Sequence, residues 1–203
     1  MNTAIEGGKT ESGIQWETHM DYDYDTTDMR SDFYIIGTRG TGRHIKVDEY
    51  CDSMDEFDAA LKAESIVYYQ PLFMLAHSGV SVSLGGYNDP WDSGQCGFAC
   101  ITRDDATEWN ILPHEYEEFL RNQVRNFDAA LRGEVFRFDI YLQNKCKECG
   151  CTGTETLDGC GGYVYPGGYA KFFEEVVEPA IAECERQLAE AEHQAEKGVR
   201  SDD

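Results

Sequence analysis

Alternating hydrophobic and polar residues predict several β-strands in the middle of the chain. The stretch "SIVYYQPLFMLAHSGVSVSLGG" reads as a strand, a turn at residues 77–79 and a second strand. In the second strand Val80, Val82 and Leu84 alternate with serines, which predicts one buried face and one solvent-exposed face. Further strands are predicted for Gly97–Thr102, "EVFRFDIYLQN" and "GYVYP", and a hairpin is predicted for Phe33–Gly37 with His44–Val47.

Hydrophobic residues at helical spacing predict the helices. Ser53 followed by Glu56 is a capping box and predicts a helix over residues 54–63. A longer apolar stripe extends to Gly133 and consists of Tyr116, Phe119, Leu120, Gln123, Val124, Phe127 and Leu131. A last stripe consists of Phe173, Val176, Val177, Ala180, Ile181, Cys184 and Leu188. Pro179 is expected to kink this last helix or to start its second half.

Together these elements predict an α+β fold for residues 33–188, as a single domain. We expect an antiparallel or mixed sheet of about six to seven strands with two longer helices packed on one face. Residues 1–32 are rich in acids and poor in aliphatic side chains, so they are predicted to form a flexible acidic arm. Residues 189–203 lack a large apolar anchor and are predicted to be a frayed acidic tail.

The formal net charge of −22 is the strongest feature of the composition. A field of this sign repels nucleic-acid phosphates, so direct nucleic-acid binding is not expected and a basic protein partner is. Three explanations of the acidity are open: imitation of a polyanion such as DNA, plain solubility, and adaptation to high salt.

The sequence predicts no membrane-spanning helix and no secretion signal. The longest apolar run is interrupted by Gln70 and Pro71 and is shorter than the roughly 20 residues that a spanning helix needs. The start "MNTAIEGGKTESG" lacks the basic and apolar regions of a signal peptide. We therefore expect a cytoplasmic protein.

The loop "NDPWDSGQCGF" is the first candidate site. Pro90 restricts one backbone dihedral, and Asp89 and Asp92 are suited to bond nearby amides, so these residues predict a rigid loop. Trp91 is not needed for a turn; it either caps the core or contacts a partner. The candidate binding residues of the turn and the loop are His77, Ser78, Asp89, Trp91, Asp92, Ser93 and Gln95.

The same residues permit a second interpretation as a hydrolytic site. His77, Ser78, Asp92 and Ser93 are expected near one end of the sheet. However, the chain has no Gly-x-Ser-x-Gly nucleophile elbow, and Ala76 provides no carboxylate to orient the histidine. A hydrogen-bonded structural network between turn and loop is favoured, and no catalytic residue is assigned.

Four of the eight cysteines lie in "CKECGCTGTETLDGC", at positions 146, 149, 151 and 160. Without a secretion signal, cysteines are read as thiols or metal ligands before disulfides. Cys146, Cys149, Cys151 and Cys160 are therefore candidate ligands of a structural zinc ion, for which four sulfurs suffice. Free thiols and a disulfide are the alternatives.

Four segments carry a resemblance to a known family: "PLFMLAHSGVSVS", "DPWDSGQCGF", "GEVFRFDIY" and "LDGCGGYVYPGGY". Over about residues 66–175 the chain resembles a family of uncharacterised bacteriophage and prophage proteins, whose members carry a His-Ser-Gly turn and a Pro-Trp-Asp-Ser-Gly-Gln loop. Here Ala76 replaces the usual acid of that turn, Cys96 replaces a valine, and glycines flank Cys160. The resemblance implies a phage origin and an accessory role, and it implies no reaction.

We therefore expect a non-enzymatic, acidic, phage-encoded binding protein in the cytoplasm of the host cell. The most specific form of this hypothesis is an inhibitor that blocks a host defence or nucleic-acid-handling protein by DNA mimicry. The alternatives are a small hydrolase or metal-dependent enzyme that uses the His77 and Asp92 region, and a structural or accessory protein of a salt-adapted phage.

Overall fold

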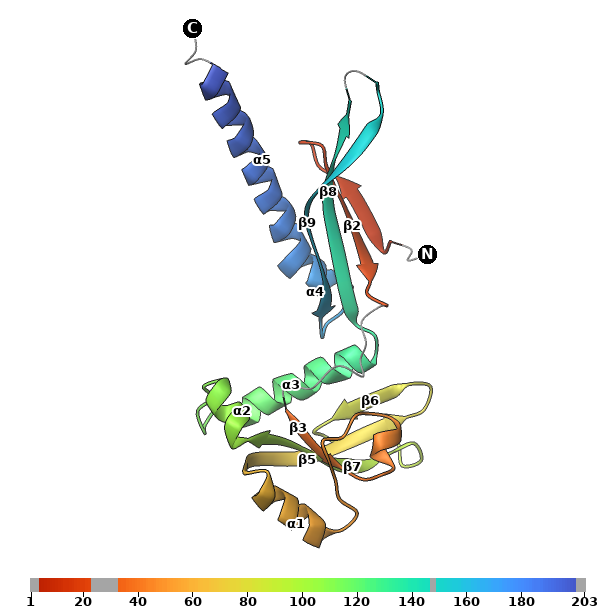
Figure 1. Cartoon of the computed structure of the whole chain (residues 1–203). Helices are drawn as coiled ribbons and strands as arrows, with labels where there is room; N and C mark the ends of the chain where they lie inside the picture. The colour runs from red at the N-terminus through yellow and green to blue at the C-terminus, as the bar shows by residue number, and fades with distance from the viewer. Residues whose placement is uncertain (1–3, 23–32, 147–148, 200–203) are drawn as a thin grey trace. The chain divides into compact units, whose positions relative to one another are not determined.

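The chain forms two compact units, each with its own β-sheet (Figure 1). The structure is a computed structural model and describes residues 4–22, 33–146 and 149–199. The first unit combines Met1–Tyr24 with Glu134–Asp203, and the second consists of Asp25–Gly133. The predicted α+β class is confirmed, but the strands form two sheets instead of one, and residues 33–188 are divided between the two units.

The second unit is built on a five-stranded sheet with the order β4-β3-β7-β5-β6. Its strands are β3 (Tyr34–Gly37), β4 (Glu49–Tyr50), β5 (Ile66–Ala76), β6 (Val80–Ser83) and β7 (Ser93–Thr102). Neighbouring strands pair antiparallel, except β3 and β4, which are parallel. The predicted strand–turn–strand around residues 77–79 and the predicted strand over Gly97–Thr102 are confirmed.

The predicted hairpin of Phe33–Gly37 with His44–Val47 is wrong. A short 3-10 helix, Thr41–Arg43, follows β3, and the chain then pairs in parallel through β4. Asp48 explains this course, because its backbone N–H donates to Ile35 O at 2.9 Å and its carboxylate accepts from Ile35 N at 2.8 Å. The apolar residues between the two strands, which suggested a strand, instead pack into the core.

Helices cover both faces of the five-stranded sheet (Figure 1). They are α1 (Met54–Ala63), α2 (Arg103–Glu108) and α3 (Tyr116–Leu131). Successive residues of a strand point to opposite faces. Accordingly Ile101 of β7 packs in the cluster that holds Leu120 of α3, while Cys100 packs in the cluster that holds Phe57 of α1. The predicted helix over 54–63 is confirmed, with Ser53 accepting from the Glu56 N–H at 3.2 Å.

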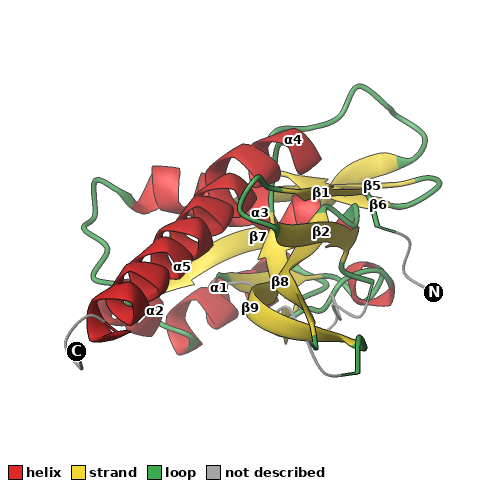
Figure 2. Ribbon diagram, turned by 90° about the horizontal axis from the view of Figure 1, so that it is seen from above, coloured by secondary structure: helices red, strands yellow, loops and turns green. Residues whose placement is uncertain are grey.

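The first unit has a four-stranded antiparallel sheet with the order β1-β2-β8-β9. Its strands are β1 (Glu6–Lys9), β2 (Ile14–Met20), β8 (Val135–Lys145) and β9 (Thr152–Val164). They are followed by α4 (Tyr169–Phe172), a π-helical turn (Phe173–Val177) and α5 (Glu178–Val199) (Figures 1 and 2). The core between sheet and helices contains Ile14, Phe136, Phe138, Ile140, Phe172, Val177 and Cys184.

Two helix predictions have different outcomes. Pro179 is the second residue of α5 and follows the π-helical turn, so the last helix restarts there as expected. The prediction that two longer helices pack on one face of one sheet is wrong, because α3 and α5 belong to different units and cover different sheets. No helix among the described residues is both long and apolar enough to cross a membrane.

The prediction of a flexible N-terminal arm is wrong for residues 4–22, which form β1 and β2. In β2 every second residue faces the core: Ile14 and Thr18 are fully buried, and the Trp16 ring lies 5.0 Å from that of Phe173. The acidic composition concealed this strand, because a strand needs only one apolar face. Residues 23–32 of the predicted arm lie outside the described residues.

The prediction of a frayed C-terminal tail is wrong for residues 189–199, because α5 continues to Val199. Most of its residues beyond Leu188 have high helix propensity. In addition, Arg186 bonds Glu183 and Glu190, each at 2.5 Å, one turn before and one turn after it. A helix is therefore favoured without a large apolar anchor.

Candidate functional site

The turn at residues 77–79 and the loop before β7 lie side by side at one end of the five-stranded sheet. Strand pairing sets this arrangement, because Leu75 of β5 is opposite Ser93 of β7. One further backbone bond, from Ala76 N to Asp92 O at 3.0 Å, extends the pairing into the loop. The expected proximity of the turn and the loop is thus confirmed.

Asp89 organises the backbone of the loop. Its carboxylate oxygen Oδ1 accepts hydrogen bonds from the N–H groups of Trp91 and Asp92, at 2.9 and 3.1 Å. The Ser93 hydroxyl donates to the Asp89 carbonyl oxygen. Bonds from the Asp92 and Trp91 N–H groups favour the carboxylate and hold the pKa of Asp89 below its ordinary value of 3.8.

His77 connects the turn to this loop. Its Nδ1 lies 2.7 Å from Asp92 Oδ2, although both side chains remain in contact with solvent. The network that the sequence predicts between turn and loop is therefore present. Because it crosses between two separate chain segments, it restrains the short segment between Asp89 and Asp92, which consists of Pro90 and Trp91.

Trp91 points into solvent. Its exposed fraction is 91%, so the interpretation that it caps the core is wrong. The physical reason lies in the loop itself: the amides of residues 91 and 92 bond the Asp89 carboxylate, and the backbone is ordered without the indole. Partner contact is the interpretation that remains for this side chain.

The other predicted binding residues surround this loop. Ser78 lies beside His77 in a pocket of about 480 Å³. The pocket is lined by Leu75, His77, Ser78, Gly79, Val80, Ser81, Leu131 and Arg132. Gln95 is exposed in β7, and its amide makes only a long contact of 3.4 Å to Gly97 O, so it lies next to the loop without supporting it.

The sequence did not predict the contribution of α3, whose Leu131 and the following Arg132 line the pocket and whose Asp128 bonds the strand beside it. Asp128 of α3 accepts from the Ser81 hydroxyl at 2.6 Å and from the Val82 N–H at 2.9 Å, and it pairs with Arg132 at 3.1 Å. A signal was present, because Ser81 falls on the polar face of the alternating strand and Asp128 interrupts the apolar stripe of α3. Nothing in either segment specified the other as its partner.

The site contains part of a hydrolytic arrangement. A histidine paired with a carboxylate at 2.7 Å is suited to accept a proton from a nucleophile. The Ser93 hydroxyl is used in its bond to Asp89 O. In the described part of the chain, the contacts of His77 include no bond to a serine hydroxyl, so the geometry forms a His–Asp pair and not a triad.

Ionised Asp89 should control the order of the loop. Because its pKa is lowered in the folded protein, the stabilisation is fully present above pH 3.8 and is lost as the pH falls through the lower, folded pKa. Asp89→Ala should accelerate hydrogen exchange at the amides of residues 91 and 92 several-fold at neutral pH. Asp89→Asn keeps the acceptor oxygen, so the amides of residues 91 and 92 should still exchange slowly in this variant, also at lower pH. If these amides exchange equally fast in both variants, Asp89 does not order the loop.

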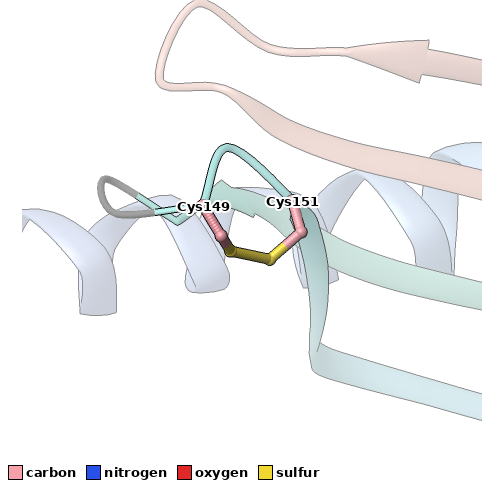
Figure 3. Close-up of a disulfide and its surroundings, with 2 residues drawn as sticks. All are labelled: Cys149 and Cys151. Atoms are coloured by element: carbon pink, nitrogen blue, oxygen red, sulfur yellow. A yellow bond between two sulfur atoms is a disulfide. The ribbon is translucent and has the colours of Figure 1, made fainter.

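The cysteine cluster lies at the reversal between β8 and β9. The Sγ atoms of Cys146, Cys149 and Cys151 lie within 4.8 Å of one another, and all three residues are exposed. Cys149 and Cys151 form a disulfide (Figure 3). This cluster has a composition that suits a metal ion, and its Cys149–Cys151 contact favours the disulfide interpretation for that pair.

Cys160 is not a member of the cluster, so the prediction of four converging sulfurs is wrong. It lies opposite Phe138, whereas the reversal begins beyond the pair formed by Lys145 and Thr152. At about 3.4 Å per residue, the eight residues from Phe138 to Cys146 place Cys160 roughly 25 Å along the hairpin from the cluster. The long pairing of β8 with β9 keeps it there.

The remaining cysteines are structural. Cys51, Cys96, Cys100 and Cys184 are buried, and burial raises the pKa of Cys96 to about 11 and that of Cys100 to about 12. A pulse of iodoacetamide at pH 8 should therefore alkylate exposed Cys160 at least about tenfold faster than Cys100. Peptide mass spectrometry measures both in one sample, and urea should remove the difference. Equal rates without urea would show that the core opens readily.

The interpretation of this site comes from the residues of the chain itself, because known proteins provide no match to compare it with. The resemblance to phage proteins accordingly stays a prediction. The sequence matches no family model, and neither curated proteins nor solved structures give a significant match.

Proposed function

We propose that the protein is a non-enzymatic binding protein of phage origin that engages a basic protein through the Trp91 loop. The observation that carries this proposal is the 91% exposure of Trp91 on a backbone that Asp89 holds in place. Tryptophan is enriched among the residues that dominate binding energy. A side chain presented on an ordered loop also loses little backbone freedom when a partner covers it.

Charge supports a basic partner. The chain has 39 acidic against 17 basic side chains, and Trp91 itself lies between Asp89, Pro90 and Asp92. A lysine or arginine over the indole gains a cation–π interaction of about 0.5–2 kcal/mol. The nearby carboxylates strengthen this preference for a cationic group and accelerate its diffusional approach.

DNA mimicry is the specific form of the proposal. A mimic needs carboxylates on ordered surfaces, whereas charge that serves only solubility has no such requirement. Glu117 and Glu118 on α3 are ordered and exposed, and so are Glu174, Glu175 and Glu178 at the start of the last helical segment. This placement supports a target that normally binds nucleic acid, such as a host defence protein.

Competition with DNA tests the proposal. The immobilised protein should retain a DNA-binding protein from a bacterial lysate, and a short duplex or added salt should elute it, because the attraction is electrostatic. Glu117→Gln/Glu118→Gln should weaken retention, while Glu190→Gln/Glu192→Gln, with the same change in net charge, should not. If both variants behave alike, the charge serves solvation or salt adaptation and mimicry is wrong.

A small hydrolase is the second candidate, favoured by the His77–Asp92 pair beside the pocket. It predicts that the protein hydrolyses an activated ester and that His77→Ala removes this activity. Ester hydrolysis that is unchanged in His77→Ala, or no hydrolysis above background, would exclude it.

Structural zinc at Cys146, Cys149 and Cys151 is also part of the proposal. Cys146, Cys149 and Cys151 would hold the ion through three thiolates, and solvent would supply the fourth ligand of the tetrahedral coordination that zinc prefers. The convergence of the three sulfurs within 4.8 Å supports this ion, and elemental analysis of the reduced protein tests it.

A further inference from the structure

The three sulfurs at the tip of the β8–β9 hairpin are suited to two different chemical states, a disulfide and a set of metal-binding thiolates. The Cys149–Cys151 disulfide uses two of them, and the Cys146 sulfur lies within 4.8 Å of both. A thiophilic metal ion needs the same sulfurs as thiolates. Because one sulfur cannot serve in both states, metal binding and disulfide formation exclude each other.

The backbone around the cluster is held independently of the sulfurs. Cys146 N donates to Cys151 O at 2.8 Å, and Gly150 N donates to Cys146 O at 2.9 Å. Gly150 has φ +71°, a conformation that costs glycine little. The strands are paired up to Lys145 and Thr152 immediately below the reversal. The thiols thus stay close together after reduction, which lowers the entropic cost of closing a metal site.

From this geometry we infer that the hairpin tip is a redox-controlled site for a thiophilic d¹⁰ ion such as Zn²⁺. The inference rests on the zinc proposed above. In the reduced state the thiolates of Cys146, Cys149 and Cys151 bind the ion, and water occupies the remaining position. In the oxidised state the Cys149–Cys151 disulfide leaves the Cys146 sulfur as the one ligand of this set, and the ion is released.

The oxidation step balances with a peroxide as the oxidant. The Cys149 thiol gives up its proton, the resulting thiolate attacks one peroxide oxygen, and the O–O bond breaks to give a sulfenic acid and hydroxide, which takes up that proton to form water. The Cys151 thiol then attacks this sulfur, the S–O bond breaks, and a second water leaves. Two thiols and one hydrogen peroxide therefore give one disulfide and two waters, and a dithiol reductant reverses the reaction by exchange.

Exposure distinguishes this cluster from the other cysteines. The three residues are exposed, so a peroxide and a reductant reach them without unfolding, whereas Cys96 and Cys100 are buried. Cys160 is exposed as well but lies far along β9, which makes it the matched control. Accessible thiols that lie next to a resolving cysteine are those in which reversible oxidation is favoured.

The test uses the full chain, reduced and freed of metal, then titrated with Zn²⁺ in the presence of a coloured zinc chelator. We expect one equivalent of Zn²⁺ to bind, one equivalent of hydrogen peroxide to release it, and a dithiol reductant to restore binding. Co²⁺ in place of Zn²⁺ should show sulfur-to-metal charge-transfer absorption that disappears on oxidation. Mass spectrometry of the hairpin peptide should show the Cys149–Cys151 disulfide in the released state.

Single substitutions assign the sulfurs. Cys146→Ser, Cys149→Ser and Cys151→Ser should each weaken zinc binding by about 100-fold or more, because even the loss of an outer hydrogen-bond partner of a ligand costs about 10–100-fold. Cys160→Ser should bind and release zinc like the natural chain. Cys146→Ser should still form the Cys149–Cys151 disulfide, which separates the two states experimentally.

The outcomes separate the switch from the proposed zinc. If the reduced chain binds no Zn²⁺, or if Cys160→Ser abolishes binding, both the zinc site and the switch are overturned. If the reduced chain binds Zn²⁺ but peroxide neither releases it nor forms the disulfide, the switch alone is overturned.

Discussion

Trp91→Ala is expected to weaken binding of the basic partner by about 30-fold or more while leaving the stability of the protein unchanged. A residue that dominates an interface contributes at least about 2 kcal/mol, which corresponds to this factor in Kd. The melting temperature should not change, because a side chain that is 91% exposed contributes little to the core. Binding is measured by titration with the protein retained in the DNA competition experiment.

Trp109→Ala is the matched control for this prediction. Trp109 is also exposed, at 52%, but lies at the C-terminal end of α2 and outside the Trp91 loop. It should retain the natural affinity. An equal loss of binding in both variants would indicate a general contribution of surface tryptophans. A loss of several degrees in the melting temperature of Trp91→Ala would indicate that Trp91 packs in the core.

Ile14→Ala is expected to lower the free energy of unfolding by about 2–5 kcal/mol, the usual cost of truncating a buried isoleucine. Ile14 has no exposed surface and packs in the same cluster as Ile140 and Phe172. Urea denaturation measures the effect, and hydrogen exchange at the amides of β8 locates it in the first unit. Ile5→Ala, at a position that is 41% exposed, should change stability by less than about 0.5 kcal/mol.

Deletion of residues 1–22 extends the same test. It removes β1 and β2 and leaves β8 without its partner from Phe136 to Leu142. The composition of this segment predicts a dispensable arm, whereas its packing predicts that the first unit unfolds. An unchanged melting temperature in the deletion variant, or a neutral Ile14→Ala, would show that β2 does not support the fold.

Much of the candidate site was predictable because its signals are local. Aspartates beside Pro90 predicted the bonded loop, and a turn at residues 77–79 between alternating strands predicted where that loop would meet His77. The direction of Trp91 was not predictable in this way. An indole next to a strand is equally consistent with core and solvent, and the choice depends on whether the sheet face beside it is already filled.

The sequence by itself determined the elements whose residues interact within about a turn or across a tight reversal. These include the capped helix at residues 54–63, the strand pair around residues 77–79 and the apolar stripe of α3. Their signals depend on periodicity and on neighbouring side chains, so a single segment contains them. Only the tertiary structure decided which strands share a sheet. Strand β2 pairs with β8 across more than a hundred residues, and neither segment considered alone specifies the other as its partner. The register of the β8–β9 hairpin separated Cys160 from the other three sulfurs, because strand register determines which side chains lie at the reversal.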